Sequence, residues 1–136
     1  GSADPADVPA LLPPILDDNA ELVIGVRRFT GGGRPGARTR ATVRLIGTIY
    51  RHRFADVGPL RAIRYPALVA LGMSDRGDGW NVEMQVRAVK LGVGIVEVSV
   101  SARAPLHRRG GPRAAARAVG SAGRTLFHIL RHSTLR

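Results

Sequence analysis

The sequence has no cysteine, few aromatic residues and almost no lysine. Its 136 residues include three Phe, two Tyr, one Trp and one lysine, Lys90. The absence of cysteine excludes a disulfide scaffold, a cysteine zinc site and a thiol nucleophile. The shortage of aromatic side chains predicts an aliphatic core and provides no set of rings on which nucleic-acid bases could stack. No apolar run approaches the ~18 residues of a membrane span.

Arginine supplies nearly all of the positive charge, and the charge is unevenly distributed. The net charge is +11 at pH 7. Residues 1–26 hold five acids and no base, whereas residues 27–53 hold eight Arg and no acid. Residues 54–100 hold five charges of each sign, and residues 101–136 hold eight Arg and no acid. Because arginine binds phosphate and carboxylate with two parallel hydrogen bonds, the two basic segments indicate an anionic partner.

The pattern of apolar residues predicts alternating helices and strands, which is typical of an α/β fold. Asp4 followed by Pro5 predicts a helix start, and Pro13 with Pro14 predicts its early end or a kink. We expect helices at 5–16, 38–52, 65–71, 80–91 and 113–133, and strands at 21–26, 56–64 and 95–100.

The last predicted helix is basic and amphipathic. Four arginines share one side of it: Arg113, Arg117, Arg124 and Arg131. Apolar residues occupy the opposite side. This pattern fits either a solvated surface helix or a helix that lies on an anionic membrane surface.

Three further features of the sequence are candidate sites. Residues 31–33 (GGG) lack the spacing of known phosphate-binding loops and are interpreted as an ordinary loop. His128 and His132 are four residues apart, but no third ligand accompanies them, so a zinc site is not expected. Glu83 has two interpretations: an ion pair with Arg87 one helical turn later, or a partly buried base near a helix N-terminus.

Six stretches, taken together, resemble the family 2 glycosyltransferases, in particular bacterial proteins similar to dolichol-phosphate mannosyltransferase. They are residues 1–5 (GSADP), 21–28 (ELVIGVRR), 56–64 (DVGPLRAIR), 79–84 (GWNVEM), 95–98 (IVEV) and 109–111 (RGG). Members of that family commonly read D-G-S-x-D-P, G-S-R-R, D-x-G-P-F-R-A-I, G-W-x-V-E-M, x-E-V-P-V and R-x-G-G-x-S-K in this order. Each motif is weak alone, but six in register are specific.

The resemblance implies the C-terminal half of a GT-A domain, with a mixed sheet flanked by helices. Residues 1–100 would form the acceptor-side half, and residues 101–136 a basic loop and the amphipathic helix. In the family, the preceding half binds the nucleotide sugar and carries an Asp-x-Asp metal motif. We therefore expect about 100 more residues upstream in the gene. We expect Mg or Mn to bind only with that half, no metal ligand in this chain, and no activity of this chain alone.

The resemblance also implies a function and a set of site residues. The full enzyme would transfer a hexose from a nucleotide sugar to a polyprenyl-phosphate or similar lipid-phosphate acceptor. Glu83 and Asp56 are the expected catalytic residues, with Glu83 positioning the acceptor if its oxygen is already anionic. The residues expected to bind the acceptor phosphate are Arg27, Arg28, Arg38, Arg40, Arg61, Arg109 and Arg113. The residues expected to shape the motifs are Gly58, Pro59, Gly79 and Trp80.

The sequence departs from the family pattern at several positions. Pro112 and Arg113 follow the glycine pair where the family has Ser and Lys, and Leu60 and Ser99 replace the usual Phe and Pro. These changes keep open a truncated or inactive relative. A basic nucleic-acid-binding module is the other alternative, supported only by charge; no nucleic-acid motif is present, so a nucleic-acid partner is not expected. The expected location is the cytoplasm, peripheral at the inner face of the membrane.

Overall fold

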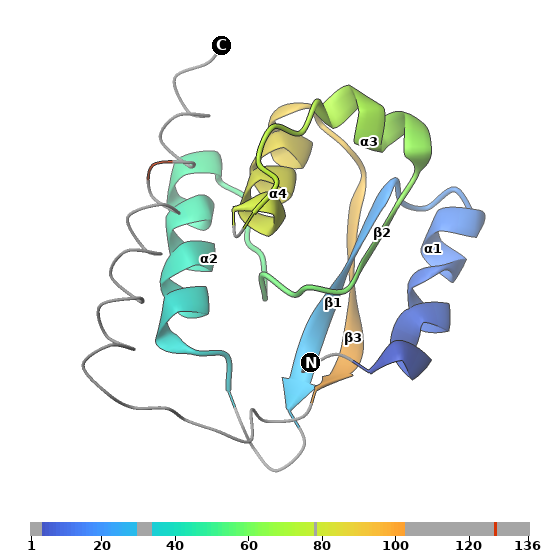
Figure 1. Cartoon of the computed structure of the whole chain (residues 1–136), viewed down its shortest axis with the longest axis horizontal. Coiled ribbons are helices and arrows are strands. Elements are labelled where there is room, and N and C mark those ends of the chain that lie inside the picture. The colour runs from blue at the N-terminus through green and yellow to red at the C-terminus, as the bar shows by residue number, and fades with distance from the viewer. Residues whose placement is uncertain (1–3, 30–33, 78, 103–126, 128–136) are drawn as a thin grey trace.

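The computed structural model describes residues 4–29, 34–77, 79–102 and 127, and this part of the chain forms an α/β fold (Figure 1). The elements in chain order are η1 (Pro5–Leu11), α1 (Pro13–Leu16), β1 (Leu22–Phe29), α2 (Ala37–Tyr50), β2 (Arg61–Ile63), α3 (Tyr65–Leu71), α4 (Trp80–Lys90) and β3 (Ile95–Ala102). The α/β class and the mixed sheet flanked by helices, both expected from the sequence, are confirmed.

The three described strands form one sheet in the order β2-β1-β3. Strands β1 and β3 run parallel in a register that extends from Leu22 opposite Ile95 to Phe29 opposite Ala102. Strand β2 pairs antiparallel with the first half of β1. The central position of β1 explains its continuous apolar run, because a strand covered on both faces needs no alternation.

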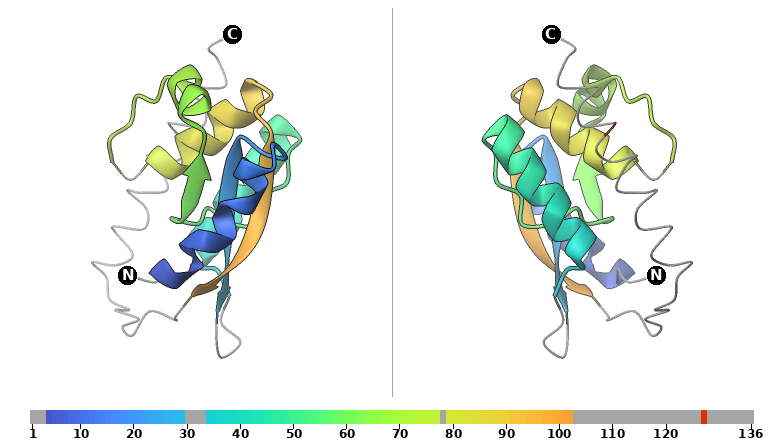
Figure 2. Two further views of the ribbon diagram at one scale, coloured as in Figure 1. Left: turned by 90° about the vertical axis from the view of Figure 1, so that its right-hand side faces the viewer. Right: turned by 90° about the vertical axis from the view of Figure 1, so that its left-hand side faces the viewer.

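The core lies on both faces of the sheet (Figure 2). Successive side chains of a strand point to opposite faces. Leu22 and Ile24 therefore pack with Ile46 of α2 and Val86 of α4, and α3 joins the same cluster. Val23 packs on the other face with the segment that contains η1 and α1.

The first predicted helix is wrong in type. Instead of one α-helix over 5–16, the chain forms a 3-10 helix and then one α-helical turn. The Asp4 side chain does cap it, because its Oδ1 accepts a hydrogen bond from the Ala6 N–H at 3.0 Å. Pro9, Pro13 and Pro14 have no N–H to donate, so a regular ladder of α-helical hydrogen bonds cannot run through the segment.

The predicted strand over 56–64 is also too long, since only Arg61–Ile63 pairs in the sheet. Pro59 cannot donate to a ladder, and the residues before β2 form an irregular loop. The other predicted helices and strands within the described residues are present, and β1 and β3 end at Phe29 and Ala102, beyond their predicted ends. Apart from Phe127, the predicted helix over 113–133 lies outside the described residues, as do the glycine loop and both histidines of the 128/132 pair.

Candidate functional site

An ion pair between Arg27 and Asp56 lies at the centre of the candidate site. The Arg27 Nε donates to Asp56 Oδ2 and its Nη2 donates to Asp56 Oδ1, each at 2.7 Å. The Asp56 side chain has no exposed surface, whereas that of Arg27 is 18% exposed. Arg27 lies near the C-terminal end of β1 and Asp56 in the loop before β2, so residues far apart in the sequence form the pair.

Two glycines allow this loop to lie directly against β1. A Cβ atom on Gly58 would stand 2.1 Å from the carbonyl oxygen of Gly25. No side chain fits at such a distance, so Gly58 is required by close approach of the two backbones. The Gly25 N–H donates to the Leu60 carbonyl at 2.9 Å and ties the loop to the strand. These contacts fix the position of Asp56 beneath Arg27.

The Asp56 carboxylate orients the Arg27 guanidinium. Backbone N–H groups of Arg27 and Val57 also donate to its oxygens, at 3.2 and 2.7 Å. The hydrogen bonds that Arg27 donates to Asp56 raise the pKa of Arg27, although burial opposes this effect. Among the described residues, Arg27 Nη1 has no recorded acceptor. Arg27 thus stays charged, is held in one orientation, and retains donors with which to bind an anion.

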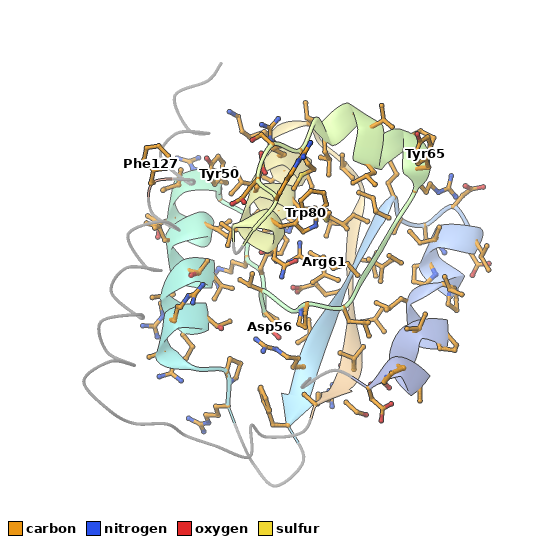
Figure 3. All side chains as sticks on the ribbon, viewed as in Figure 1. Tyr50, Asp56, Arg61, Tyr65, Trp80 and Phe127 are labelled. Carbon is orange, nitrogen blue, oxygen red and sulfur yellow. The ribbon has the colours of Figure 1, made fainter. Side chains whose placement is uncertain are left out.

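Arg61 lies beside this pair (Figure 3). Its Nε donates to the Gly58 carbonyl at 3.1 Å and its Nη1 to the Asn81 carbonyl at 2.8 Å. Burial lowers the pKa of Arg61 to about 10, against the opposing effect of the Asp56 charge. Its Nη2 is buried without a hydrogen-bond partner within the described part of the chain. Arg61 therefore joins the Asp56 loop to the first turn of α4.

Gln85 completes the support of the Asp56 loop, and the sequence patterns did not point to it. Its side chain is fully buried, and its Nε2 donates to the Asp56 backbone carbonyl at 2.8 Å. Its Oε1 is buried and has no partner among the described residues. The available signal was a polar residue on a helix whose neighbours, Met84 and Val86, are apolar and buried. Buried polar side chains at such positions are normally bound to something.

Glu83 belongs to a separate cluster around the loop before α4. Its carboxylate accepts hydrogen bonds from the backbone N–H groups of Ser74 and Asp75, from the Ser74 hydroxyl and from Arg87 Nε. Burial by itself would raise the pKa of Glu83, but these hydrogen bonds and the Arg87 charge lower it to about 2. The predicted pair of Glu83 with Arg87 is confirmed at 2.9 Å. The catalytic role of Glu83 stays a prediction, and this geometry favours positioning over proton abstraction, since an ionised, fully bonded carboxylate is a weak base.

The remaining predicted site residues belong to several different elements. Arg28 is exposed and its Nε donates to Ser99 Oγ at 2.8 Å, on the opposite face of β1. Arg38 and Arg40 are exposed on the first turn of α2, where Arg40 donates to the Pro35 carbonyl. Pro59 follows Gly58 in the sequence, and Gly79 and Trp80 precede Asn81. Arg109 and Arg113 lie outside the described residues.

The described residues do not supply a metal site. No three His, Cys, Asp or Glu side chains among them are grouped so as to hold a metal ion. Both Asp56 oxygens already accept hydrogen bonds from Arg27. We therefore assign no chemical step to a metal in this part of the chain. Within the same residues, no helix has both the length and the apolar character required to cross a bilayer.

The chain is similar to proteins named uncharacterized glycosyltransferases from Mycobacterium bovis and from two strains of Mycobacterium tuberculosis. Each is 39% identical over 105 residues, which cover 74% of this chain and 48% of the relative. The chain thus spans about half the length of these relatives. Their names support a glycosyltransferase and go no finer. No protein-family model matches the chain, and no solved structure matches it significantly.

Proposed function

We propose that this chain is the acceptor-side part of a family 2 glycosyltransferase of GT-A fold, similar to dolichol-phosphate mannosyltransferase. The complete protein transfers a hexose from a nucleotide sugar to a polyprenyl phosphate or a similar lipid phosphate at the inner face of the membrane. The similarity to mycobacterial glycosyltransferases supports the glycosyltransferase part of this proposal, because it covers 74% of the chain. The six motifs that resemble family 2 supply its finer part. The arrangement around Arg27 supports the acceptor part of it.

Arg27 is suited to bind the phosphate of the acceptor. Asp56 holds two of its nitrogens, so the guanidinium loses little conformational freedom when an anion binds to the rest. Its exposed fraction of 18% gives a ligand access while it shields most of the ion pair from water. Arg61 and Gln85 keep the Asp56 loop in place through hydrogen bonds to the backbone carbonyls of Gly58 and Asp56. In this proposal Arg27 binds the substrate and Asp56 is a positioning residue.

The reaction needs little base catalysis in this arrangement. The phosphate oxygen of the acceptor is already anionic, and it attacks the anomeric carbon of the hexose. The bond from that carbon to the nucleoside diphosphate breaks, and the diphosphate leaves with the electron pair. No proton has to be removed from the acceptor. This fits a Glu83 that is ionised and fully hydrogen-bonded, and that holds residues 74 and 75 against α4.

The test is an assay of the complete gene product with radiolabelled nucleotide hexoses and a short polyprenyl phosphate. We expect a lipid-soluble labelled product from one of the nucleotide sugars. Replacing Arg27 by Lys should raise KM for the acceptor at least tenfold, because lysine cannot hold both Asp56 and a phosphate in the same geometry. Arg28→Lys is the matched control: the resemblance implies a phosphate-binding role for Arg28 too, but its contact with Ser99 on the opposite face of β1 leads us to propose that KM changes less than twofold.

Two results would overturn the proposal. One is the absence of transfer from every nucleotide hexose by a folded complete protein, which would favour the inactive relative. The other is an equal effect of Arg27→Lys and Arg28→Lys, which would remove Arg27 from the acceptor site. A Glu83→Gln variant that folds and keeps its turnover would leave Glu83 as a structural residue only.

A further inference from the structure

A cavity lies between α2 and the segment that follows it, and none of its described lining residues is hydrogen-bonded to Arg27. Its volume is about 470 Å³, within the range of ~300–1,000 Å³ typical of small-molecule sites. The described residues that line it are Val43, Arg44, Gly47, Thr48, Arg53 and Phe54. Neither the sequence motifs nor the proposed transfer reaction uses any of them.

The lining combines an apolar surface with two cationic groups. Val43 and Phe54 are partly or fully buried, and the Phe54 side chain belongs to the main core cluster. Arg44 and Arg53 are exposed, and no hydrogen bond or ion pair joins either guanidinium to another described residue. No acid occurs between residues 27 and 53, and Asp56 is engaged by Arg27. The positive charge at this cavity is therefore not neutralised by the surrounding described residues.

Gly47 keeps part of this cavity open. Glycine inside a helix is less stable than alanine, so its presence in α2 calls for a reason. The backbone conformation of Gly47 is not that reason, because its φ angle is not positive. Among the described residues, a Cβ atom there would meet only the His52 carbonyl oxygen at 3.6 Å, an ordinary contact distance. What glycine provides at this position is free volume on the lining of the cavity.

We propose that this cavity binds an amphiphilic anion: an apolar chain or ring that ends in a phosphate or carboxylate group. The apolar part lies against Val43, Gly47 and Phe54, and the anionic group is bound by Arg44 and Arg53. Two guanidinium groups that have no partner in the described part of the chain are suited to such a group, because each forms charge-assisted hydrogen bonds to its oxygens. The site requires no sugar donor and does not rest on the proposed transfer reaction.

The site also has a direct connection to the Arg27–Asp56 pair. Arg53 and Phe54 precede Asp56 in the same loop. Ala55 lies between Phe54 and Asp56, and its N–H donates to the Glu97 carboxylate of β3 at 3.0 Å. An occupant that contacts Arg53 and Phe54 would therefore restrict the segment that leads to Asp56. Binding in this cavity and binding at Arg27 should consequently influence one another.

Calorimetric titration with octyl phosphate, below its micelle concentration, tests the proposal. The chain used carries Arg27→Lys, which weakens the proposed acceptor site, so that binding in the cavity is measured apart from binding at Arg27. Octanoate, inorganic phosphate and the neutral octyl glucoside serve as comparison ligands. We expect one molecule of octyl phosphate or octanoate to bind at least tenfold more tightly than inorganic phosphate and octyl glucoside. The order of the two amphiphiles identifies the preferred anionic group, and either order supports the site.

Variants separate this cavity from general charge attraction. The double change Arg44→Gln and Arg53→Gln should weaken binding at least tenfold, whereas Arg34→Gln with Arg51→Gln removes the same charge elsewhere and should weaken it less than twofold. Gly47→Ala should raise Tm, because it improves the helix, and at the same time weaken binding. Gly47→Leu should weaken it further.

Three results would overturn the proposal. The first is equal affinity for octyl phosphate and inorganic phosphate. The second is an equal loss of binding in the two double variants, which would indicate attraction by net charge alone. The third is unchanged affinity in a folded Gly47→Leu variant, which would place the ligand outside the cavity.

Discussion

Two buried carboxylates, Asp56 and Glu83, have similar surroundings and different consequences for the molecule. Neither has exposed side-chain surface, and each is paired with a partly exposed arginine, at 2.7 Å to Arg27 and 2.9 Å to Arg87. The Glu83 pair links residues four apart on one helix, while the Asp56 pair links residues 29 apart on a strand and a loop. The same ion-pair chemistry therefore stabilises a single helix when its two residues are four apart, and joins distant elements when they are far apart in the sequence.

The two carboxylates also differ in what their contacts join. Glu83 accepts from residues 74, 75 and 87, and Arg87 further donates to the Leu71 carbonyl at 2.9 Å. That cluster fastens α3 and the following loop to α4. Asp56, in contrast, joins the loop before β2 to the central strand β1 through Arg27.

The largest expected effect comes from removal of Asp56. Asp56→Ala leaves Arg27 and Arg61 without their counter-charge in a mostly buried position. Breaking a buried ion pair in this way costs about 3–5 kcal/mol. The free energy of unfolding, measured by urea titration, should fall by that amount. The exposed Asp17→Ala variant is the control, and the same loss there would contradict the special position of Asp56.

Acid titration tests the Glu83 cluster. The pKa of Glu83 is lowered from 4.5 to about 2 in the folded chain. Its contribution is therefore fully present above about pH 4.5 and is lost as the pH falls toward 2. That difference corresponds to about 3 kcal/mol. Urea titrations should show that wild type loses this much more than Glu83→Gln between pH 6 and pH 2. Parallel pH curves for the two proteins would mean that Glu83 titrates normally.

The contact that positions Asp56 can be disturbed without any change in charge. Gly58→Ala forces a Cβ atom toward the Gly25 carbonyl, and overpacking of this kind costs about 1–3 kcal/mol. Gly94→Ala is the matched control, since a Cβ atom there would make only ordinary contacts with described residues, at 3.8 Å or more. Thermal unfolding should show a lower Tm for Gly58→Ala and a nearly unchanged Tm for Gly94→Ala. An equal Tm for the two would show that the loop shifts at little cost.

The smallest expected effect concerns the arginine next to Arg27. Arg28→Ala removes an exposed hydrogen bond to Ser99 and should change the free energy of unfolding by less than about 0.5 kcal/mol. Arg27→Ala should cost several times more, because it leaves Asp56 buried and unpaired. Urea titration of the two single variants is sufficient. Equal costs would mean that the pairing with Asp56 contributes no more than a surface contact.

Local patterns in the sequence were sufficient for most of the helices. The apolar spacing over 38–52 and 80–91 predicted α2 and α4, and the short helix expected over 65–71 is α3. These signals work because helix formation depends on neighbours three and four residues apart. They failed over 5–16 and 56–64, where prolines and close backbone contacts decided the conformation.

The candidate site could be predicted only in part. Asp56, Gly58 and Arg61 were identified as members of one motif by resemblance, and Arg27 was identified from another. Their direct contact follows from the pairing of β1 with β2 and from the fit of Gly58 against Gly25, neither of which leaves a local signal. Gln85 was missed for the same reason, since its partner is the backbone of a residue 29 positions away.

Composition and spacing within one helical turn are enough to predict the α/β class, the excess of arginine and an ion pair of Glu83 with Arg87 as one of two interpretations. The contact of Asp56 with Arg27, and the position of Arg44 and Arg53 beside one cavity, come from the tertiary structure. Those relations require segments distant in sequence to pack together, and packing is governed by the shape of the whole core.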